Sequence, residues 1–165
     1  MTEKTLAMKL LEGKRVPYDT AVYPTTIRDA QEVAKAIGAN SAQVFKTLVV
    51  LPPEEKGPKA KPMLYILPAH HQLNLKKLAK TVGVKKVKMA THNQAESLTG
   101  LQVGGISPLA LLNKGFAIYL DEAAKSQKTI YISAGERGRQ IKLAVKDLVN
   151  VTRAKFAAAS DPVTQ

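Results

Sequence analysis

One lysine lies in the middle of an apolar segment. Lys46 stands within residues 44–51, V-F-K-T-L-V-V-L, which end at Pro52-Pro53. A run this rich in β-branched and aromatic residues predicts a buried strand. A lysine in such a strand reaches water along its stem, pairs with an acid or points into a polar pocket, because an unpaired ammonium is costly to bury. Spacing alone favours a surface lysine, so the other segments must decide.

A glycine-rich segment follows about sixty residues later. Residues 100–108 read G-L-Q-V-G-G-I-S-P, with Gly104 and Gly105 adjacent. Adjacent glycines permit positive φ and close approach of a backbone to a ligand, and successive free N–H groups there can bind a carbonyl oxygen or an oxyanion. The pattern matches neither a phosphate-binding P-loop nor a G-x-S-x-G elbow. On its own it is equally typical of a tight turn before a helix at Leu109.

A third segment, residues 131–141, reads Y-I-S-A-G-E-R-G-R-Q-I and predicts a strand, a glycine turn and a second strand. Ser133 lies where the first strand meets the turn, a common position for functional side chains. Taken alone, Ser133 is better explained by a hydrogen bond to the turn backbone.

Other classes of site are not expected. The chain has no cysteine, which removes disulfides, thiolate zinc sites and a cysteine nucleophile, and fits a reducing cytoplasm. His70 and His71 are adjacent and should point apart on a strand, and no carboxylate cluster accompanies them or His92. We therefore expect no metal and no cofactor. Nothing in the sequence places a histidine beside Ser107 or Ser133, so a catalytic triad is not supported.

The charge balance favours a polyanionic partner. The net charge is +12, from 25 Lys and Arg against 13 Asp and Glu. Five Tyr, three Phe and no Trp are too few for stacking platforms that hold several bases. The sequence shows neither a signal peptide nor an apolar run that could span a membrane, so we expect a cytoplasmic protein without membrane contact. The leading phosphate-contact surface is the lysine cluster Lys76, Lys77, Lys80, Lys85, Lys86 and Lys88.

The elements that must position these residues follow from hydrophobic periodicity. The strand at 63–67 is expected to pair with the Lys46 strand as a hairpin. Short strands mixed irregularly with helices predict a single α+β domain with a mixed sheet over residues 1–158, followed by a flexible tail at 159–165. Helices are predicted at 5–15, 29–37, 73–82, 91–98 and, after a short strand, through 148–159; strands are predicted at 17–23, 44–51, 63–67, 84–89, 116–120, 129–133 and 141–145.

Taken in order, the three segments resemble the YbaK family of freestanding aminoacyl-tRNA editing proteins, which is related to the editing insertion of bacterial prolyl-tRNA synthetase. The resemblance runs from Lys9 to Phe156 and includes the lysine-rich segment 73–80, L-N-L-K-K-L-A-K. It implies a compact α+β fold with a mixed, barrel-like sheet flanked by helices. It also implies a deacylase, with aminoacyl-tRNA as substrate and prolyl-tRNA synthetase as a candidate partner.

The resemblance also implies residue roles. Lys46 takes the catalytic position, and the lysine-rich helix supplies tRNA phosphate contacts through Lys76, Lys77 and Lys80. One departure stands at Gln140, where some members carry an aspartate, and this weakens a carboxylate role there. The implied substrate-binding residues are Tyr23, Thr47, Gly104, Gly105, Ile106, Ser107, Pro108, Ser133 and Gly135.

The expected function is removal of mischarged cysteine from tRNA(Pro), with the substrate's own thiol attacking the ester. An aminoacyl ester is already activated, so the protein mainly positions it and stabilises developing negative charge. One alternative is an alanyl- or seryl-tRNA deacylase of the same fold that uses an ordered water. Another alternative is a non-catalytic basic RNA-binding module, although a lysine inside a core strand is a poor place for a phosphate-binding surface.

Overall fold

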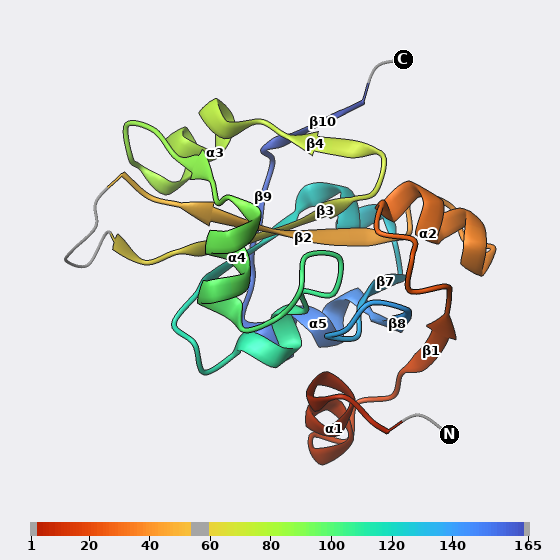
Figure 1. Cartoon of the computed structure of the whole chain (residues 1–165). Helices are drawn as coiled ribbons and strands as arrows, with labels where there is room; N and C mark the ends of the chain where they lie inside the picture. The colour runs from red at the N-terminus through yellow and green to blue at the C-terminus, as the bar shows by residue number, and fades with distance from the viewer. Residues whose placement is uncertain (1–2, 54–59, 164–165) are drawn as a thin grey trace.

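Short helices are interspersed with short strands along the chain (Figure 1). The computed structural model describes residues 3–53 and 60–163. None of the helices in these ranges is long and apolar enough to cross a membrane. The helices are α1 (Leu6–Gly13), α2 (Ala30–Ile37), α3 (Leu75–Val82), α4 (His92–Thr99) and α5 (Val145–Thr152), with 3₁₀ helices η2 (Pro108–Leu111) and η3 (Glu122–Ser126). The strands are β1 (Asp19–Val22), β2 (Phe45–Leu51), β3 (Met63–Pro68), β4 (His71–Leu73), β5 (Lys88–Met89), β6 (Ala117–Asp121), β7 (Thr129–Ser133), β8 (Arg139–Ala144), β9 (Lys155–Ala157) and β10 (Ser160–Pro162).

The largest sheet is mixed, as predicted. Its five strands follow the order β5-β2-β3-β6-β9, with β2 antiparallel to β3 and β5, and with β6 parallel to β3 and β9. The predicted hairpin is confirmed, and Lys46 lies opposite Leu67 in it. A three-stranded sheet, β1-β8-β7, meets the start of β2 through a bridge between Val44 and Tyr131. The predicted single compact α+β domain with a mixed sheet is confirmed. The predicted barrel-like closure is not confirmed, because the sheets are open.

Side-chain caps set the helix ends. Asp29 precedes α2 and accepts from the backbone of Glu32, and Gly38 ends the helix at φ +73°. Thr91 and Gln94 form a reciprocal capping box at the start of α4, and Gly100 ends that helix at φ +73°. These boundaries agree with the sequence prediction because their signals lie within one turn of the helix end.

Strand β3 lies at the centre of the core, and all six of its residues are buried. Alternate side chains point to opposite faces of the sheet. Tyr65 and Leu67 pack in the cluster that includes Leu78 of α3, and Leu64 packs in the cluster that includes Ala95 of α4. Helices α3 and α4 therefore cover opposite faces of the sheet.

Along the middle of β2, one edge has no neighbouring strand among the described residues. On that side β5 pairs only with Val50 and Leu51, and the bridge to β7 reaches only Val44. The predicted strand at 84–89 is shorter than expected, since only Lys88–Met89 pairs. The stretch of β2 that carries Lys46 is consequently open on one side.

The C-terminal segment differs from the prediction. A helix extending to Ala159 is wrong, because α5 ends at Thr152 and Arg153 follows in the left-handed region at φ +57°. The expected tail includes Ala159, which is fully buried, and Ser160–Pro162, which pairs with β4 as β10. An alanine-rich stretch has helical propensity, but here edge pairing with β6 and β4 outweighs it.

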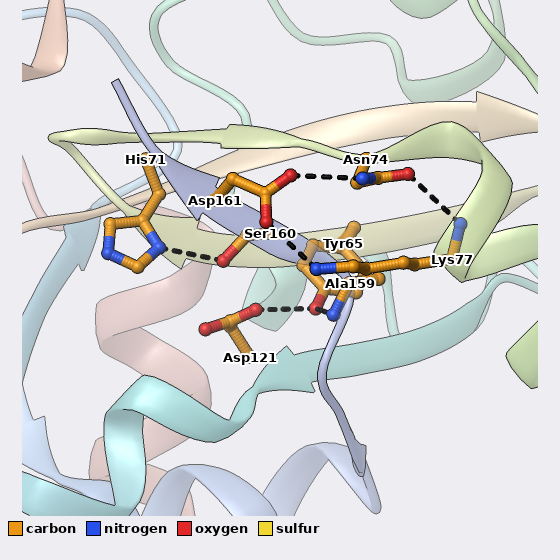
Figure 2. Close-up of polar contacts among 8 residues, drawn as sticks. All are labelled: Tyr65, His71, Asn74, Lys77, Asp121, Ala159, Ser160 and Asp161. Carbon is orange, nitrogen blue, oxygen red and sulfur yellow. Dashed lines mark hydrogen bonds and ion pairs between the residues drawn. The ribbon is translucent and has the colours of Figure 1, made fainter. Parts of the chain in front are cut away.

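Polar side chains, some buried and some at the surface, hold this C-terminal segment in place (Figure 2). The Tyr65 hydroxyl donates to Asp121 Oδ1 at 2.6 Å and accepts from the Ala159 N–H at 2.9 Å. Burial, followed by the bond to Asp121, raises the pKa of Tyr65. Asp161 accepts from Asn74 and pairs with Lys77, both at 2.9 Å. Residues about ninety positions apart are thus joined into one unit.

Candidate active site

A cavity of about 420 Å³ lies along the open edge of β2. Its walls come from β2, from the starts of α2 and α4, and from the glycine-rich residues 100–108, called the glycine loop below. The end of β7 and the start of β8 complete the walls. Its volume falls in the range of small-molecule sites. The lining residues are Tyr23, Arg28, Asp29, Ala30, Val33, Val44, Phe45, Lys46, Thr47, Leu48, Val49, Met89, Ala90, His92, Ala95, Val103, Gly104, Ile106, Ser133 and Gln140.

Lys46 lines this cavity and is half-buried. Its Nζ donates to the Ala69 carbonyl oxygen at 3.4 Å, a long contact that leaves further N–H bonds for a ligand. Burial lowers the pKa of Lys46, and the negative charge of Asp29 partly opposes this. Lys46 is therefore a half-buried lysine that contributes to the cavity lining.

Three charged or titratable groups at the cavity were not predicted from the sequence. Arg28 and Asp29 come from the turn before α2, and His92 is the first residue of α4. Asp29 could be recognised in the sequence as a helix cap. The effect of the Asp29 charge on the pKa of Lys46 could not be predicted from the sequence, because the two residues belong to separate elements.

Gly104 and Gly105 differ in their roles. Gly104 lines the cavity at φ +92°, a conformation that favours glycine, and a Cβ there would meet Arg137 Nε at 3.5 Å. Gly105 is buried outside the lining and donates its N–H to the Gln102 carbonyl at 2.8 Å. A Cβ at Gly105 would lie 2.8 Å from the backbone nitrogen of Arg137. Gly105 is therefore needed where the glycine loop contacts the neighbouring β7–β8 turn, and its N–H is already used.

Three further predicted residues support the site from outside the lining. Ser107 is fully buried and accepts from the Leu109 N–H at 3.2 Å, which caps the 3₁₀ helix that begins at Pro108. Gly135 donates its N–H to Ser133 Oγ at 3.2 Å. By contrast, Ile106 lines the cavity.

Neutral polar side chains complete the lining. Ser133 and Gln140 are cross-strand partners on β7 and β8, and both are buried. Thr47 Oγ1 and Gln140 Oε1 are out of contact with solvent and have no hydrogen-bond partner among residues 3–53 and 60–163. Tyr23 also lines the cavity, as predicted. Buried polar atoms without partners are uncommon in folded proteins, so this pair marks a place where a ligand can supply the missing bonds.

The predicted phosphate contacts lie on α3, apart from the cavity lining. Lys76, Lys77 and Lys80 are exposed. Lys77 is already paired with Asp161, so it also helps to hold β10. The structure does not bring this helix into the cavity wall.

The chemistry available in the cavity is positioning and charge stabilisation. Lys46 supplies a cation, Thr47 and Ser133 supply hydroxyls, and the bond from Gly135 leaves the Ser133 hydroxyl hydrogen free to donate. Across residues 3–53 and 60–163, no group of three or more His, Asp or Glu side chains is placed to hold a metal ion.

The family model of the aminoacyl-tRNA editing domain matches residues 25–151, which include Lys46, Gly104, Ser133 and Gln140. The chain belongs to the aminoacyl-tRNA editing domain family. The predicted resemblance is therefore confirmed, and it extends over the elements that form the cavity.

Three relatives place this editing domain among freestanding proteins and synthetases. The "Putative Cys-tRNA(Pro)/Cys-tRNA(Cys) deacylase EbsC" of Enterococcus faecalis is 38% identical over 94% of this chain and 92% of its own length. The proline–tRNA ligase of Shouchella clausii is 29% identical over 67% of this chain but only 18% of the ligase. A crystal structure of a "putative trans-editing enzyme for prolyl tRNA synthetase" has a TM-score of 0.78 and 25% identity, covering 97% of this chain and 99% of the other.

Proposed function

We propose that this editing domain is a trans-editing deacylase that removes mischarged cysteine from tRNA(Pro). The observation that carries the proposal is the position of Lys46, a half-buried cation inside a small cavity with Gly104 and Ser133 in the same lining. The name of the Enterococcus faecalis relative supports the same substrate. The Shouchella clausii ligase supports a link to prolyl-tRNA synthetase.

In this proposal Lys46 stabilises the negative charge that develops on the ester carbonyl oxygen. A charged donor in a cavity that excludes water is worth more than the same donor in bulk water. The Gly104 backbone lets the terminal ribose approach closely.

The nucleophile in the proposal is the thiol of the substrate. Its sulfur attacks the ester carbonyl carbon, a carbon–sulfur bond forms, and the ester carbon–oxygen bond breaks. The thiol proton passes to the ribose oxygen that leaves, and the cyclic thiolactone then hydrolyses to cysteine. This route needs no protein nucleophile, which fits a chain without cysteine in which Ser133 Oγ is bonded to its own turn. It also supplies selectivity that pocket size alone cannot.

The same cavity also fits an alanyl- or seryl-tRNA deacylase that uses an ordered water. Lys46 would hold the carbonyl in the same way, and the polar groups of Thr47 and Ser133 are available to position a water. The two routes differ in what they require of the substrate side chain.

The deciding experiment charges one tRNA(Pro) with cysteine, alanine, serine or proline and follows ester cleavage by the protein. We expect cysteinyl-tRNA to be cleaved fastest and prolyl-tRNA to be spared. Methylation of the cysteine thiol should abolish turnover, because the nucleophile is lost. Efficient cleavage of alanyl-tRNA would replace the thiol route by the water route. Cleavage of none of the four would contradict the deacylase and favour a non-catalytic RNA-binding module.

We also propose that Lys76 and Lys80 of α3 contact tRNA phosphates. Their exposure and the +12 net charge support this. A Lys76→Ala/Lys80→Ala variant should weaken tRNA binding and reduce the slope of log K against log salt by about 0.9 for each lost contact. Lys77 is left intact because it pairs with Asp161. A wild-type salt slope would place the phosphate surface elsewhere.

A further inference from the structure

Gln140 is the buried polar group of the cavity for which the proposed chemistry gives no role. Its side chain is 5% exposed, lines the cavity, and carries an Oε1 that finds no hydrogen-bond partner in the part of the chain that the structure describes. Leaving such an acceptor unpaired destabilises the unliganded protein. This arrangement is therefore typical of a group whose partner arrives with the ligand.

The missing partner must be a hydrogen-bond donor, because a carboxamide oxygen only accepts. An aminoacyl ester carries its strongest donors on the α-ammonium group. A thiol donates weakly, and an alanine methyl group does not donate. The ribose hydroxyl groups are donors too, but they are neutral and so form weaker bonds.

Charge separation in the cavity points to the same group. Lys46 is a cation on β2, so a second cation is repelled from it. Gln140 lies on β8 of the other sheet and is neutral, beside its cross-strand partner Ser133. The carbonyl oxygen of the ester is attracted to Lys46. The Asp29 carboxylate also lines the cavity, but it already accepts from the Glu32 N–H and raises the pKa of Lys46. Gln140 Oε1 is therefore left as the acceptor for the ammonium group.

We propose that Gln140 binds the α-ammonium group of the aminoacyl ester and so restricts the site to esters with a free amino group. The inference rests on the proposed deacylase function. It makes Gln140 a substrate-binding residue that selects the amino acid end of the substrate independently of its side chain.

The test compares cysteinyl-tRNA with 3-mercaptopropionyl-tRNA, which keeps the thiol and lacks only the amino group. The ratio of their kcat/KM values is measured for the wild type and for Gln140→Met, which keeps the length of the side chain and removes the amide. The difference in intrinsic ester reactivity cancels between the two proteins. We expect the wild-type ratio to exceed the Gln140→Met ratio by about tenfold to a hundredfold, as for a hydrogen bond to a charged group.

Two variants complete the design. Gln140→Glu keeps an acceptor and should preserve or increase the wild-type ratio. Thr47→Val removes the other unpaired polar atom of the cavity and should lower cleavage of both esters by the same factor, which leaves the ratio unchanged. If Gln140→Met does not fold, Gln140→Glu provides the test. A kcat/KM ratio for Gln140→Glu that is lower than the wild-type ratio would then overturn the proposal.

Other outcomes are also decisive. Equal kcat/KM ratios in the wild type and a folded Gln140→Met would overturn the role of Gln140 while the deacylase function stands. If kcat/KM also falls by the same factor for both esters in that variant, the amide contacts the ribose or contributes to packing instead. Absence of cleavage by the wild type would instead contradict the proposed function itself.

Discussion

Lys46 and Asp29 contribute opposite charges to the cavity, which Arg28 also lines. Burial lowers the pKa of Lys46, and the Asp29 carboxylate raises it, so the protonated form of the lysine depends on its acidic neighbour. Gln140 and Thr47 contribute polarity without charge. The residue-scale consequence is that Lys46 should govern both the rate of deacylation and its dependence on pH.

Lys46→Met should lower kcat/KM for deacylation by about a hundredfold, the scale of one lost charge-stabilising donor. The fold should persist, because the substitution removes a partly buried charge and keeps the apolar stem. Single-turnover deacylation and the circular dichroism spectrum are the measurements. Lys35→Met, at an exposed position of α2, is the matched control and should retain activity. A Lys46→Met variant within threefold of wild type would return Lys46 to a surface role.

Asp29→Asn should move the alkaline limb of the pH–rate profile to lower pH. Removing the carboxylate removes the interaction that raises the pKa of Lys46, so the ammonium is lost earlier as pH rises. Asparagine still caps a helix, so α2 should remain in place. The measurement is kcat/KM against pH with spontaneous ester hydrolysis subtracted. An unchanged or more alkaline limb would show that Lys46 does not control activity.

The open edge of β2 and the contact between two turns position the cavity at the scale of elements. Strand β5 stops after two residues, so the segment around Lys46 pairs with β3 on one side and with none of the described strands on the other. The glycine loop is held against the β7–β8 turn, where Arg137 Nε donates to the Val103 carbonyl at 2.7 Å. Gly105 packs against the same turn. The loop that carries Gly104 is therefore placed by packing as well as by its own backbone.

Gly105→Ala should lower both stability and turnover. The added Cβ would lie 2.8 Å from the backbone of Glu136 and Arg137, so the loop must shift and move Gly104 with it. Thermal unfolding and deacylation at saturating substrate are the measurements. The control is Gly13→Ala at the end of α1, where a Cβ meets nothing within 4 Å. If Gly105→Ala matches Gly13→Ala in both measurements, the loop contact does not position the site.

At the scale of the whole molecule, the C-terminal strands join the last residues of the described chain to the central sheet and to β4. Strand β9 extends the sheet beside β6, and β10 pairs with β4 (Figure 1). The Tyr65 hydroxyl connects β3 to Asp121 and to the backbone at Ala159 (Figure 2). This network lies apart from the cavity lining, so it should affect stability more than catalysis.

Tyr65→Phe should destabilise the protein by about 1–3 kcal/mol, since a buried carboxylate oxygen and a backbone N–H lose their partner. Each kcal/mol corresponds to a fall of about 2–4 °C in Tm for a chain of this size. Tyr119→Phe is a close control, because Tyr119 lies beside Tyr65 in register and its hydroxyl forms no hydrogen bond within residues 3–53 and 60–163. A Tm for Tyr65→Phe equal to that of Tyr119→Phe would contradict this account of the network.

Much of the secondary structure and part of the site could be predicted from the sequence, because their signals are local. Asp29 and Thr91 cap their helices through bonds within one turn, and Gly38 ends α2 in the same way. The hairpin that carries Lys46 follows from adjacent apolar runs separated by prolines. Residues close in sequence meet at little entropic cost, so their types predict their structure.

Only the tertiary structure decided the rest. The alanine-rich segment near Ala157 became strand because β6 and β4 offered open edges, and no local pattern encodes such a partner. Likewise, Asp29 acts on Lys46, and Gly105 contacts Arg137, across separate elements. The sequence by itself determined which residues could do chemistry; long-range packing decided which of them, with Gln140, share one cavity.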